Sequence, residues 1–476
     1  MEIVVELKQG KLKGKLERDV LSFTKIPYGK DMGRFKALAP PEQWEGIYDA
    51  TVPAPVFPQT LSRLSTVIGT LPEENHHSES AFYLNVYAKN STRKKPVLFW
   101  IHGGAFITGG GTLPWYDGTS IAGNGDLVVV SVNYRLGVLG NLHIPGVSEP
   151  NLAFKDLIQA FTWVKGNIAA FGGDPEQMTI AGQSAGAWFA TAFMSVPKLQ
   201  GQFKNAAILS FPGGLRPLKE AEEQVLRAEF LKELSLDRNS WNQLYDLPVE
   251  TILEAQQKTA AKLAAEGSIA SFTPVYDGEL LREDIIQGAA DVSKDRVHVF
   301  IGFTADETTS FFHSLPESVP EEALHKVIGK LTAADARQIV EAYRKTYPND
   351  HNQRLLVNIS SELIFDLPTI ALMDRLADRG ANIYAYRFDY PSSNPKLAAC
   401  HCLELPFLFG NFGSWKSAPM LLGCSDAENR LVSGQFQKMV IELAHQGERF
   451  DLWPKYESRS RKAMSVRVNS EMIELG

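Results

Sequence analysis

The spacing of hydrophobic and polar residues changes along the chain, from regular alternation at the start to long apolar runs further on. Residues 1–14 alternate apolar and polar side chains, which predicts a strand with one solvated face. Three later runs, 95–104, 126–135 and 176–182, are almost continuously apolar. Strands of that kind are typical of a parallel sheet with both faces covered. The helical periodicity of residues 153–168 places a helix between two of these strands.

The second half of the chain adds two strand-like runs, 295–303 and 381–390, far apart in the sequence. The residues around them have helical composition and spacing at 217–235, 248–266, 320–346 and 354–379. Such stretches cannot extend a sheet, so they are helical insertions packed over its edge or top. We therefore predict one α/β domain over residues 1–476, with a doubly wound, mostly parallel sheet and helical insertions at about 215–270 and 315–380. The functional groups of such a sheet gather at the carboxyl ends of its strands.

The composition is that of a folded globular protein, with 44% hydrophobic and 22% charged residues among 476. The formal net charge of −7 provides no positive field, and the longest basic cluster is the short run Arg93-Lys94-Lys95. We therefore expect no nucleic-acid partner and no membrane partner. The first residues lack the pattern of a signal peptide, and no apolar run approaches the ~18 residues of a membrane span. These features favour a cytoplasmic protein.

The three cysteines, Cys400, Cys402 and Cys424, are too few and too clustered for a disulfide framework, which fits a reducing compartment. Metal ligands are normally separated by two or more residues, and no second Cys/His pair stands near Cys400-His401-Cys402. We therefore predict no metal and no cofactor.

Ser184 lies in Gly182-Gln183-Ser184-Ala185-Gly186, which matches G-x-S-x-G. This nucleophile elbow needs small neighbours because its serine sits on a strained turn between a strand and a helix. The strand-like residues before the motif and the helix-forming residues after it provide that context. The pattern favours an activated serine over a structural turn.

An activated serine needs donors for the oxyanion that forms during acyl transfer, and a glycine pair follows the strand at 95–101. The backbone amides of Gly103 and Gly104, with that of Ala185 after the serine, are our candidates for the oxyanion hole. His102 precedes this pair. We assign it a structural role, because the loop acts through its backbone amides and depends on the backbone conformation.

The general base is expected after the acid in the order serine, acid, histidine. Of the late histidines, His401 stands in a loop shortly after the strand at 381–390, where the base of such a sheet should be. For the acid, the strand at 295–303 runs into Asp306 and Glu307, and their spacing does not choose between them.

These residues, taken together, resemble the type B carboxylesterase family, and the pattern is most similar to that of its bacterial para-nitrobenzyl esterases. The similarity runs along nearly the whole chain and rests on ordered motifs: F-x-K-I-P-Y-G at 23–29, S-E-x-x-x-Y-L-N-V-Y at 78–87, H-G-G-A-F at 102–106, N-Y-R-L-G-V-L-G at 133–140, G-Q-S-A-G-A at 182–187, T-x-D-E at 304–307 and H-x-L-E-L-P-F-L-F-G at 401–410. The resemblance implies an α/β-hydrolase fold and a serine esterase.

The resemblance also assigns roles by position. It implies a catalytic triad of Ser184 as nucleophile, Glu307 as acid and His401 as base, which resolves the choice between the two adjacent carboxylates. It places the oxyanion glycines at Gly103 and Gly104. It further implies two structural ion pairs, one of Arg34 with Glu79 and one of Arg135 with Asp156.

The chain departs from the family pattern at several positions. Gln183 replaces the usual glutamate before the serine, which removes a negative charge and weakens the case for a cationic substrate. Ser210-Phe211-Pro212 replaces the usual Ser-Gly, so we expect a hydroxyl near the acid to be missing or displaced. Thr308 stands where glycine is typical. The cysteines of the family's first disulfide are absent near Phe57 and Ala81.

We expect hydrolysis of uncharged, partly apolar carboxylic esters through an acyl-enzyme on Ser184, by a monomer or homodimer. The side chains expected to line the substrate pocket flank the catalytic motifs: Phe106, Gln183, Trp188, Phe311, Phe312, Phe407 and Leu408. Two alternatives stay open, namely a catalytically silent adhesion-type member of the family and a hydrolase of amides, lactones or thioesters. A nucleotide-binding protein ranks last, because no G-x-G-x-x-G follows the first strand of a βαβ unit.

Overall fold

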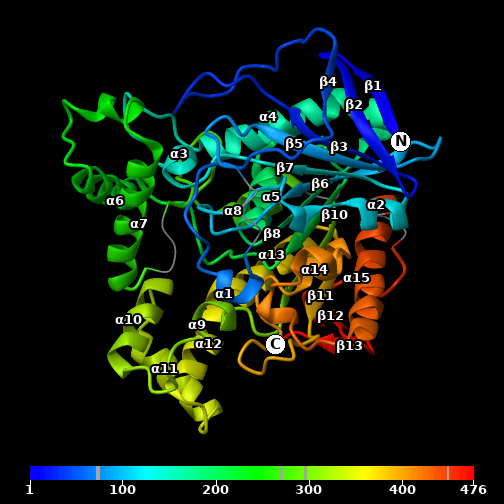
Figure 1. Ribbon diagram of the computed structural model, residues 1–476. Helices are drawn as coiled ribbons and strands as arrows, with labels where there is room; N and C mark the ends of the chain where they lie inside the picture. The colour runs from blue at the N-terminus through cyan, green and yellow to red at the C-terminus, as the bar shows by residue number, and fades with distance from the viewer. Residues whose placement is uncertain (71–75, 269–271, 294–296, 447–449) are drawn as a thin grey trace.

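A computed structural model describes residues 1–70, 76–268, 272–293, 297–446 and 450–476, and its centre is a sheet of thirteen strands (Figure 1). The order of the strands is β1-β2-β3-β5-β7-β6-β8-β9-β10-β11-β12-β13, with β4 paired to β2. The ladders from β7 through β12 are parallel, whereas β1, β2, β3, β5 and β13 add antiparallel edges and the short β4 pairs with β2 in parallel. The predicted doubly wound, mostly parallel sheet is therefore confirmed.

The strands have the following bounds: β1 Glu2–Leu7, β2 Gly10–Glu17, β3 Val20–Pro27, β4 Ile47–Asp49, β5 Tyr83–Lys89, β6 Lys95–Ile101, β7 Val128–Val132, β8 Gly173–Gln183, β9 Asn205–Leu209, β10 His298–Thr304, β11 Asn382–Phe388, β12 Lys462–Val466 and β13 Glu471–Glu474. The strands predicted from apolar runs are all present, shifted by a few residues at their ends. The predicted strand 295–303 begins at His298, and its residues 295–296 lie outside the described residues.

The helices have the following bounds: α1 Ser65–Ile68, α2 Thr119–Gly125, α3 Gly137–Asn141, α4 Leu152–Asn167, α5 Ala185–Ser195, α6 Glu220–Glu233, α7 Val249–Ala265, α8 Ile285–Ser293, α9 Thr309–Phe312, α10 Glu321–Leu331, α11 Ala336–Thr346, α12 Asn352–Ser361, α13 Leu367–Ala377, α14 Glu404–Phe409 and α15 Asp426–Gln446. A π-helical segment, Glu362–Asp366, joins α12 to α13.

The core consists of two apolar layers, one on each face of the sheet. Alternate residues of β6 divide between them, because successive side chains of a strand point to opposite faces: Val97, Phe99 and Ile101 pack into one layer, and Leu98 and Trp100 into the other. Helices α4, α5, α8 and α13 cover the first face, and α2, α14 and α15 cover the second.

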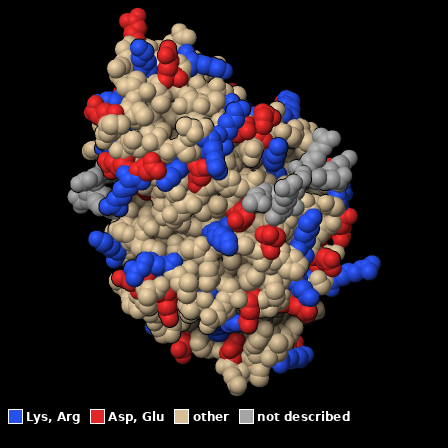
Figure 2. Space-filling view, turned by 90° about the vertical axis from the view of Figure 1, so that its right-hand side faces the viewer, with Lys and Arg blue, Asp and Glu red and all other residues tan. Residues whose placement is uncertain are grey.

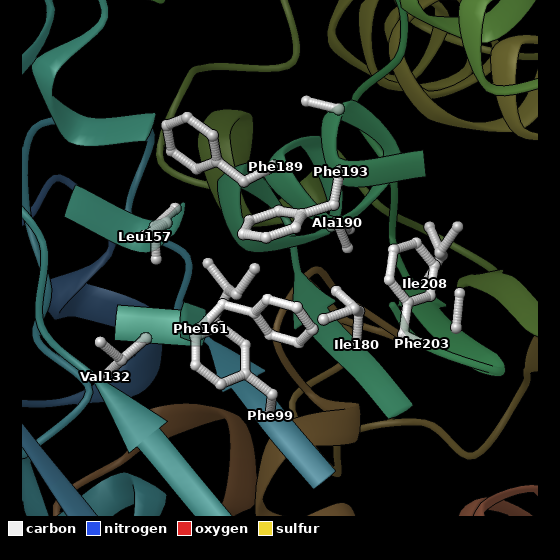
Figure 3. Close-up of a cluster of buried hydrophobic side chains, with 14 of the residues drawn as sticks. Phe99, Val132, Leu157, Phe161, Ile180, Phe189, Ala190, Phe193, Phe203 and Ile208 are labelled. Atoms are coloured by element: carbon white, nitrogen blue, oxygen red, sulfur yellow. The ribbon is translucent and has the colours of Figure 1, made fainter. Parts of the chain in front are cut away.

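Phenylalanines dominate the first layer, where Figure 3 shows their rings pointing toward one another between the strands and α5. Phe99 from the sheet meets Phe161 of α4 edge to face at 5.5 Å, and Phe193 of α5 packs on both. Such contacts contribute about 0.5–1.5 kcal/mol each beyond burial of area. This layer fixes α5, and therefore the turn that precedes it, against the sheet.

The predicted helical insertions lie to one side of the sheet, where Figure 1 shows α6 and α7 in green and α10 to α12 in yellow. The first, 215–270, holds α6 and α7, which pack with α3 around a separate small core; its residues 269–270 are outside the described residues. The second, 315–380, differs from the prediction in two ways. The stretch 320–346 is two helices with a break at Thr332, and α13 covers one face of the sheet instead of its edge or top.

Both ion pairs implied by the family resemblance are present. Arg135 meets Asp156 with Nε 2.7 Å from Oδ2, and both side chains are buried. Arg34 binds Glu79 through Nε at 2.7 Å, and its Nη1 also donates to the carbonyl oxygens of Leu244 and Leu247, at 2.7 Å each. The second arginine therefore connects an N-terminal loop to the first insertion.

The surface carries both signs of charge, and Figure 2 shows Lys and Arg interspersed with Asp and Glu over the face it displays. Among the described helices, one continuous span, Asn352–Ala377, is long and apolar enough by composition to cross a membrane, although the sequence analysis expected no such run. The protein body buries 61% of its apolar window, and α13 packs on the sheet, so its apolar residues serve the core.

Candidate active site

Ser184 lies at the sharp turn between β8 and α5. Its backbone has φ 57° and ψ −125°, a strained conformation for a residue with a side chain. A Cβ on Gly182 would lie 2.4 Å from backbone atoms of Gly186, and a Cβ on Gly186 would lie 2.0 Å from the carbonyl oxygen of Ile101. Only glycine fits on either side of the turn. The amide of Ser184 donates to the carbonyl of Leu209 at 3.0 Å, which ties the turn to β9.

The glycine loop after β6 lies directly against this turn. A Cβ on Gly103 would lie 3.0 Å from the Cβ of Ser184, so the two backbones approach as closely as glycine permits. Gly104 has φ +119°, which disfavours any side chain. The N–H groups of Gly103 and Gly104 have no backbone acceptor within the described part of the chain, and that of Gly103 lies against the hydroxyl of Tyr116. That of Ala185, at the first position of α5, has no intrahelical partner.

His102 shapes this loop from within the core, as the sequence suggested. Its Nδ1 lies 2.7 Å from the carbonyl oxygen of Gly103, and its ring stacks on Tyr134 at 4.3 Å. The Tyr134 hydroxyl donates to the His102 carbonyl at 2.8 Å. Burial lowers the pKa of His102 to about 4, so the side chain is neutral at ordinary pH.

His401 stands in the loop after β11, and its Nδ1 lies 2.5 Å from Oε2 of Glu307, which follows β10. The other oxygen of Glu307 accepts from the amide of Thr304 at 2.8 Å. Both side chains of the pair are buried. Asp306, the alternative acid, instead pairs with Arg354 at 2.9 Å. The structure thus brings Glu307, not its neighbour, to the imidazole.

The surroundings of His401 push several pKa values away from their ordinary range. Burial disfavours the imidazolium, but attraction to Cys402 and Glu307 outweighs it and raises the pKa of His401 well above its ordinary value. Burial, followed by repulsion from Glu307, raises the pKa of Glu404 to about 7. Burial, followed by the same repulsion, raises the pKa of Asp366 well above its ordinary value. These two neighbouring carboxyl groups resist ionisation, so negative charge does not accumulate around the imidazole.

A cavity of about 540 Å³ opens above Ser184, Gly103 and Gly104. The segment 59–70 and helix α7 supply much of its wall, and Trp115, Tyr116, Phe311, Leu405 and Trp415 add larger side chains. No Asp or Glu occurs among the described residues that line it, and Arg63 is the arginine in that lining. A second hollow of about 700 Å³, near the start of α15, holds none of the predicted site residues.

The predicted pocket residues fall into two groups. Gln183 and Phe311 line the cavity. The others do not line it: Phe106, Trp188, Phe407 and Leu408 are buried in the core, and Phe312 packs on the small cluster of α10 and α12. Phe106 and Trp188 meet edge to face at 5.5 Å. This corrects the prediction, because an aromatic beside a catalytic motif here holds the backbone of that motif instead of facing the cavity.

Several residues near the site were not identified from the sequence. Phe365, on the π-helical segment, packs against the His401 ring at 4.9 Å. Cys402 lines the cavity next to Gln183. The hydroxyl expected to be missing or displaced is that of Ser210, which donates to Glu404 at 2.7 Å and not to the acid Glu307. No local pattern marks a π-helical segment, whereas Cys402 and Glu404 lie inside the motif that located His401. Within the described residues, no group of three or more His, Cys, Asp or Glu side chains is arranged to hold a metal ion.

Comparisons with known proteins agree along the full length of the chain. The model of the carboxylesterase family matches residues 1–475. The para-nitrobenzyl esterase of Bacillus subtilis (strain 168) is 32% identical over 474 residues, covering 97% of this chain and 94% of the relative. The probable N-octanoylanthranilate hydrolase of Rhodococcus erythropolis is 32% identical over 465 residues, with 95% of each chain covered. The solved structure of a thermophilic PNB esterase superposes with a TM-score of 0.89 at 30% identity, over 99% of this chain and 98% of that one.

The sheet, the strained serine turn and the paired imidazole and carboxylate define the α/β-hydrolase class. Within that class the chain belongs to the carboxylesterase family, and it is a carboxylic ester hydrolase.

Proposed function

We propose that the protein is a serine carboxylesterase that hydrolyses uncharged, partly apolar esters through an acyl-enzyme on Ser184. The observation that carries this proposal is the position of Ser184. The serine stands on the floor of the cavity, 8% exposed, against the glycine loop, and its neighbour Gln183 contacts the imidazole of His401 that pairs with Glu307.

The mechanism assigns one role to each group. His401 accepts the proton of Ser184 at Nε2, and the serine oxygen attacks the ester carbonyl. The oxyanion forms against the N–H groups of Gly103, Gly104 and Ala185, each of which supplies on the order of 3 kcal/mol of transition-state stabilisation. The alcohol leaves with the proton held by His401, and water repeats the sequence on the acyl-enzyme. Glu307 holds the tautomer and balances the charge of the imidazolium.

The lining of the cavity supports the substrate class. Apolar and uncharged polar groups dominate the described lining, which lacks the carboxylates that a cationic substrate would need. The uncharged Gln183, in place of the usual glutamate, also disfavours a cationic substrate. The relatives described above are a para-nitrobenzyl esterase and a probable N-octanoylanthranilate hydrolase, and both substrates are partly apolar.

Two further expectations are part of the proposal. The protein acts in the cytoplasm, which the three free cysteines support. It acts as a monomer or homodimer on a small-molecule ester and uses no cofactor.

The test is hydrolysis of a short-chain para-nitrophenyl ester by the wild-type enzyme and by Ser184→Ala, with a fluorophosphonate probe and mass spectrometry to locate the adduct. We expect a loss of about 10⁴-fold or more in kcat in Ser184→Ala, and an adduct on Ser184 in the wild type. Ser80→Ala, an exposed serine outside the cavity lining, is the matched control and should behave like the wild type. An inert wild type without an adduct would refute the proposal.

A further inference from the structure

Gln183 and Cys402 face each other on the floor of the cavity, beside the imidazole of His401. The amide nitrogen of Gln183 lies 3.3 Å from Nε2 of His401 and 3.5 Å from Sγ of Cys402. Sγ lies 3.7 Å from the amide oxygen of Gln183. Both side chains are buried and line the cavity. The mechanism described above uses neither of them.

The contact with Glu307 determines which nitrogen of the His401 imidazole carries the proton. Because a carboxylate oxygen lies 2.5 Å from Nδ1, the neutral imidazole carries its proton on Nδ1 and presents a lone pair at Nε2. The Gln183 amide meets this lone pair through its nitrogen, which has only N–H donors, and the side chain of Cys402 also lies within hydrogen-bonding reach of the imidazole. The hydrogen bond expected from Ser184 Oγ to His401 is absent between these two described residues. Gln183 therefore occupies the lone pair that must accept the serine proton.

Cys402 contacts both ends of the amide. The amide nitrogen donates to Sγ at 3.5 Å and the thiol donates to the amide oxygen at 3.7 Å, so sulfur holds the amide in place without selecting either end. Turned the other way, the amide would place an oxygen acceptor against the lone pair of Nε2. On its far side the amide meets the glycine loop, since a Cβ on Gly103 would lie 2.9 Å from the amide oxygen of Gln183. The amide is held from both sides.

We propose that Gln183, held in place by Cys402, is a positioning residue that sets the proton affinity of Nε2 of His401 and holds the imidazole before substrate binds. The proposal rests on the esterase mechanism and deepens it. A donated N–H stabilises the neutral imidazole and not the imidazolium, so it opposes the effect of Glu307. The other ionisable groups around this pair are the Cys402 thiol, Glu404 and Asp366, and they are the same in every Gln183 variant below.

The experiment is an NMR titration of the His401 imidazole in the full-length protein labelled at histidine, with the resonance assigned by its loss in His401→Gln. Gln183→Met keeps the length of the side chain and removes the donor, so we expect the pKa of His401 to rise. Gln183→Glu places an opposite charge at the same position, and we expect a larger rise, of about 1–3 pH units. Gln257→Glu makes the same change on an exposed residue of the cavity wall and should leave this pKa where it is.

The role of the thiol is tested by Cys402→Gly, alone and with Gln183→Met. Cys402 has φ 74°, a conformation that glycine adopts freely, so the change removes the thiol without straining the backbone. If the thiol acts through the amide, its removal shifts the pKa of His401 less in the Gln183→Met background than in the wild type. Equal shifts in both backgrounds would contradict the coupling.

The decisive variant is Gln183→Met. A pKa of His401 unchanged by this substitution would overturn the proposal, even if turnover falls, because a purely structural role changes activity without changing the titration. The titration needs no turnover, so its result is separate from the fate of the esterase proposal. Labelling of wild-type Ser184 by the fluorophosphonate tests that proposal independently.

Discussion

The serine side and the base side of the active site depend on different interactions. On the serine side, Gly182, Gly186 and the glycine loop place backbone atoms as close as sterics allow, and no charged side chain takes part. On the base side, His401, Glu307 and Glu404 are buried beside the half-buried Asp366, and charge shifts the pKa values of His401, Glu404 and Asp366. The difference shows that one catalytic centre can fail in two distinct ways. Substitutions on the serine side should act at every pH, whereas substitutions on the base side should act in a pH-dependent manner.

The largest effect is expected for Gly186→Ala, which tests the steric side. The new Cβ would lie 2.0 Å from the carbonyl oxygen of Ile101, in a part of the sheet that cannot move aside. We expect a loss of more than about 4 kcal/mol of stability, seen as loss of soluble, folded protein at any pH. Gly434→Ala, in open space on α15, is the control and should raise stability by about 0.5–1 kcal/mol. A folded Gly186→Ala enzyme with the thermal midpoint of the wild type would contradict the steric argument.

The next effect is expected for Glu307→Gln, which keeps the shape of the acid and removes its charge. A wrong tautomer of the base lowers kcat by about 10⁴-fold. Activity requires neutral His401, whose pKa is raised in part by Glu307. Removing that charge lowers the pKa, so the acidic limb of the kcat/KM profile should move to lower pH. If the maximal kcat/KM falls while the acidic limb stays at the pH of the wild type, Glu307 does not act through its charge.

A smaller effect is expected for Ser210→Ala, which removes the donor to Glu404. The ionised carboxylate would lose its 2.7 Å hydrogen bond in a buried site, at a cost of about 1–3 kcal/mol. Because the pKa of Glu404 is raised to about 7 in the folded protein, the group is protonated below that pH and ionised above it. Urea unfolding should therefore show a larger destabilisation at pH 8 than at pH 5. Equal losses at the two pH values would argue against this charge dependence.

The smallest effect on activity is expected for Asp366→Asn, with turnover close to that of the wild type. Its folded pKa is raised above the unfolded value, so the carboxyl destabilises the fold increasingly as pH rises above that unfolded value. The asparagine variant escapes this penalty. Its melting temperature should equal that of the wild type near pH 4 and exceed it at pH 8. If the melting temperature of Asp366→Asn exceeds that of the wild type by the same amount at both pH values, the gain comes from packing and not from the charge of Asp366.

The difference between the two sides also explains what the sequence could reveal. Glycine spacing around Ser184 reports backbone sterics directly, so a local pattern was enough to locate the serine side. The acid was harder, because Asp306 and Glu307 are adjacent and only the fold shows that Asp306 pairs with Arg354 instead. Without the family resemblance, the two carboxylates would have stayed equivalent.

Tertiary packing accounts for the structural features that the sequence did not reveal. Phe106 and Trp188 are aromatic residues beside catalytic motifs, and only the packed layers show that they belong to the core. The π-helical segment carries Phe365 to His401, and the helix α13 that follows it packs on the sheet. The break at Thr332 has no proline, and its signals are local: the Thr332 hydroxyl accepts from the amide of Ala334, and Asp335 caps α11.

Arg34 has a consequence for engineering. Its guanidinium reaches the first insertion through the backbone carbonyls of Leu244 and Leu247, not through their side chains. Recognition of backbone alone makes this contact independent of the side chains at these two positions. Chimeras that replace the insertion should therefore preserve the path of the chain at the two carbonyls and the apolar face that α6 and α7 pack against α3, and they can vary the residues of α7 that line the cavity.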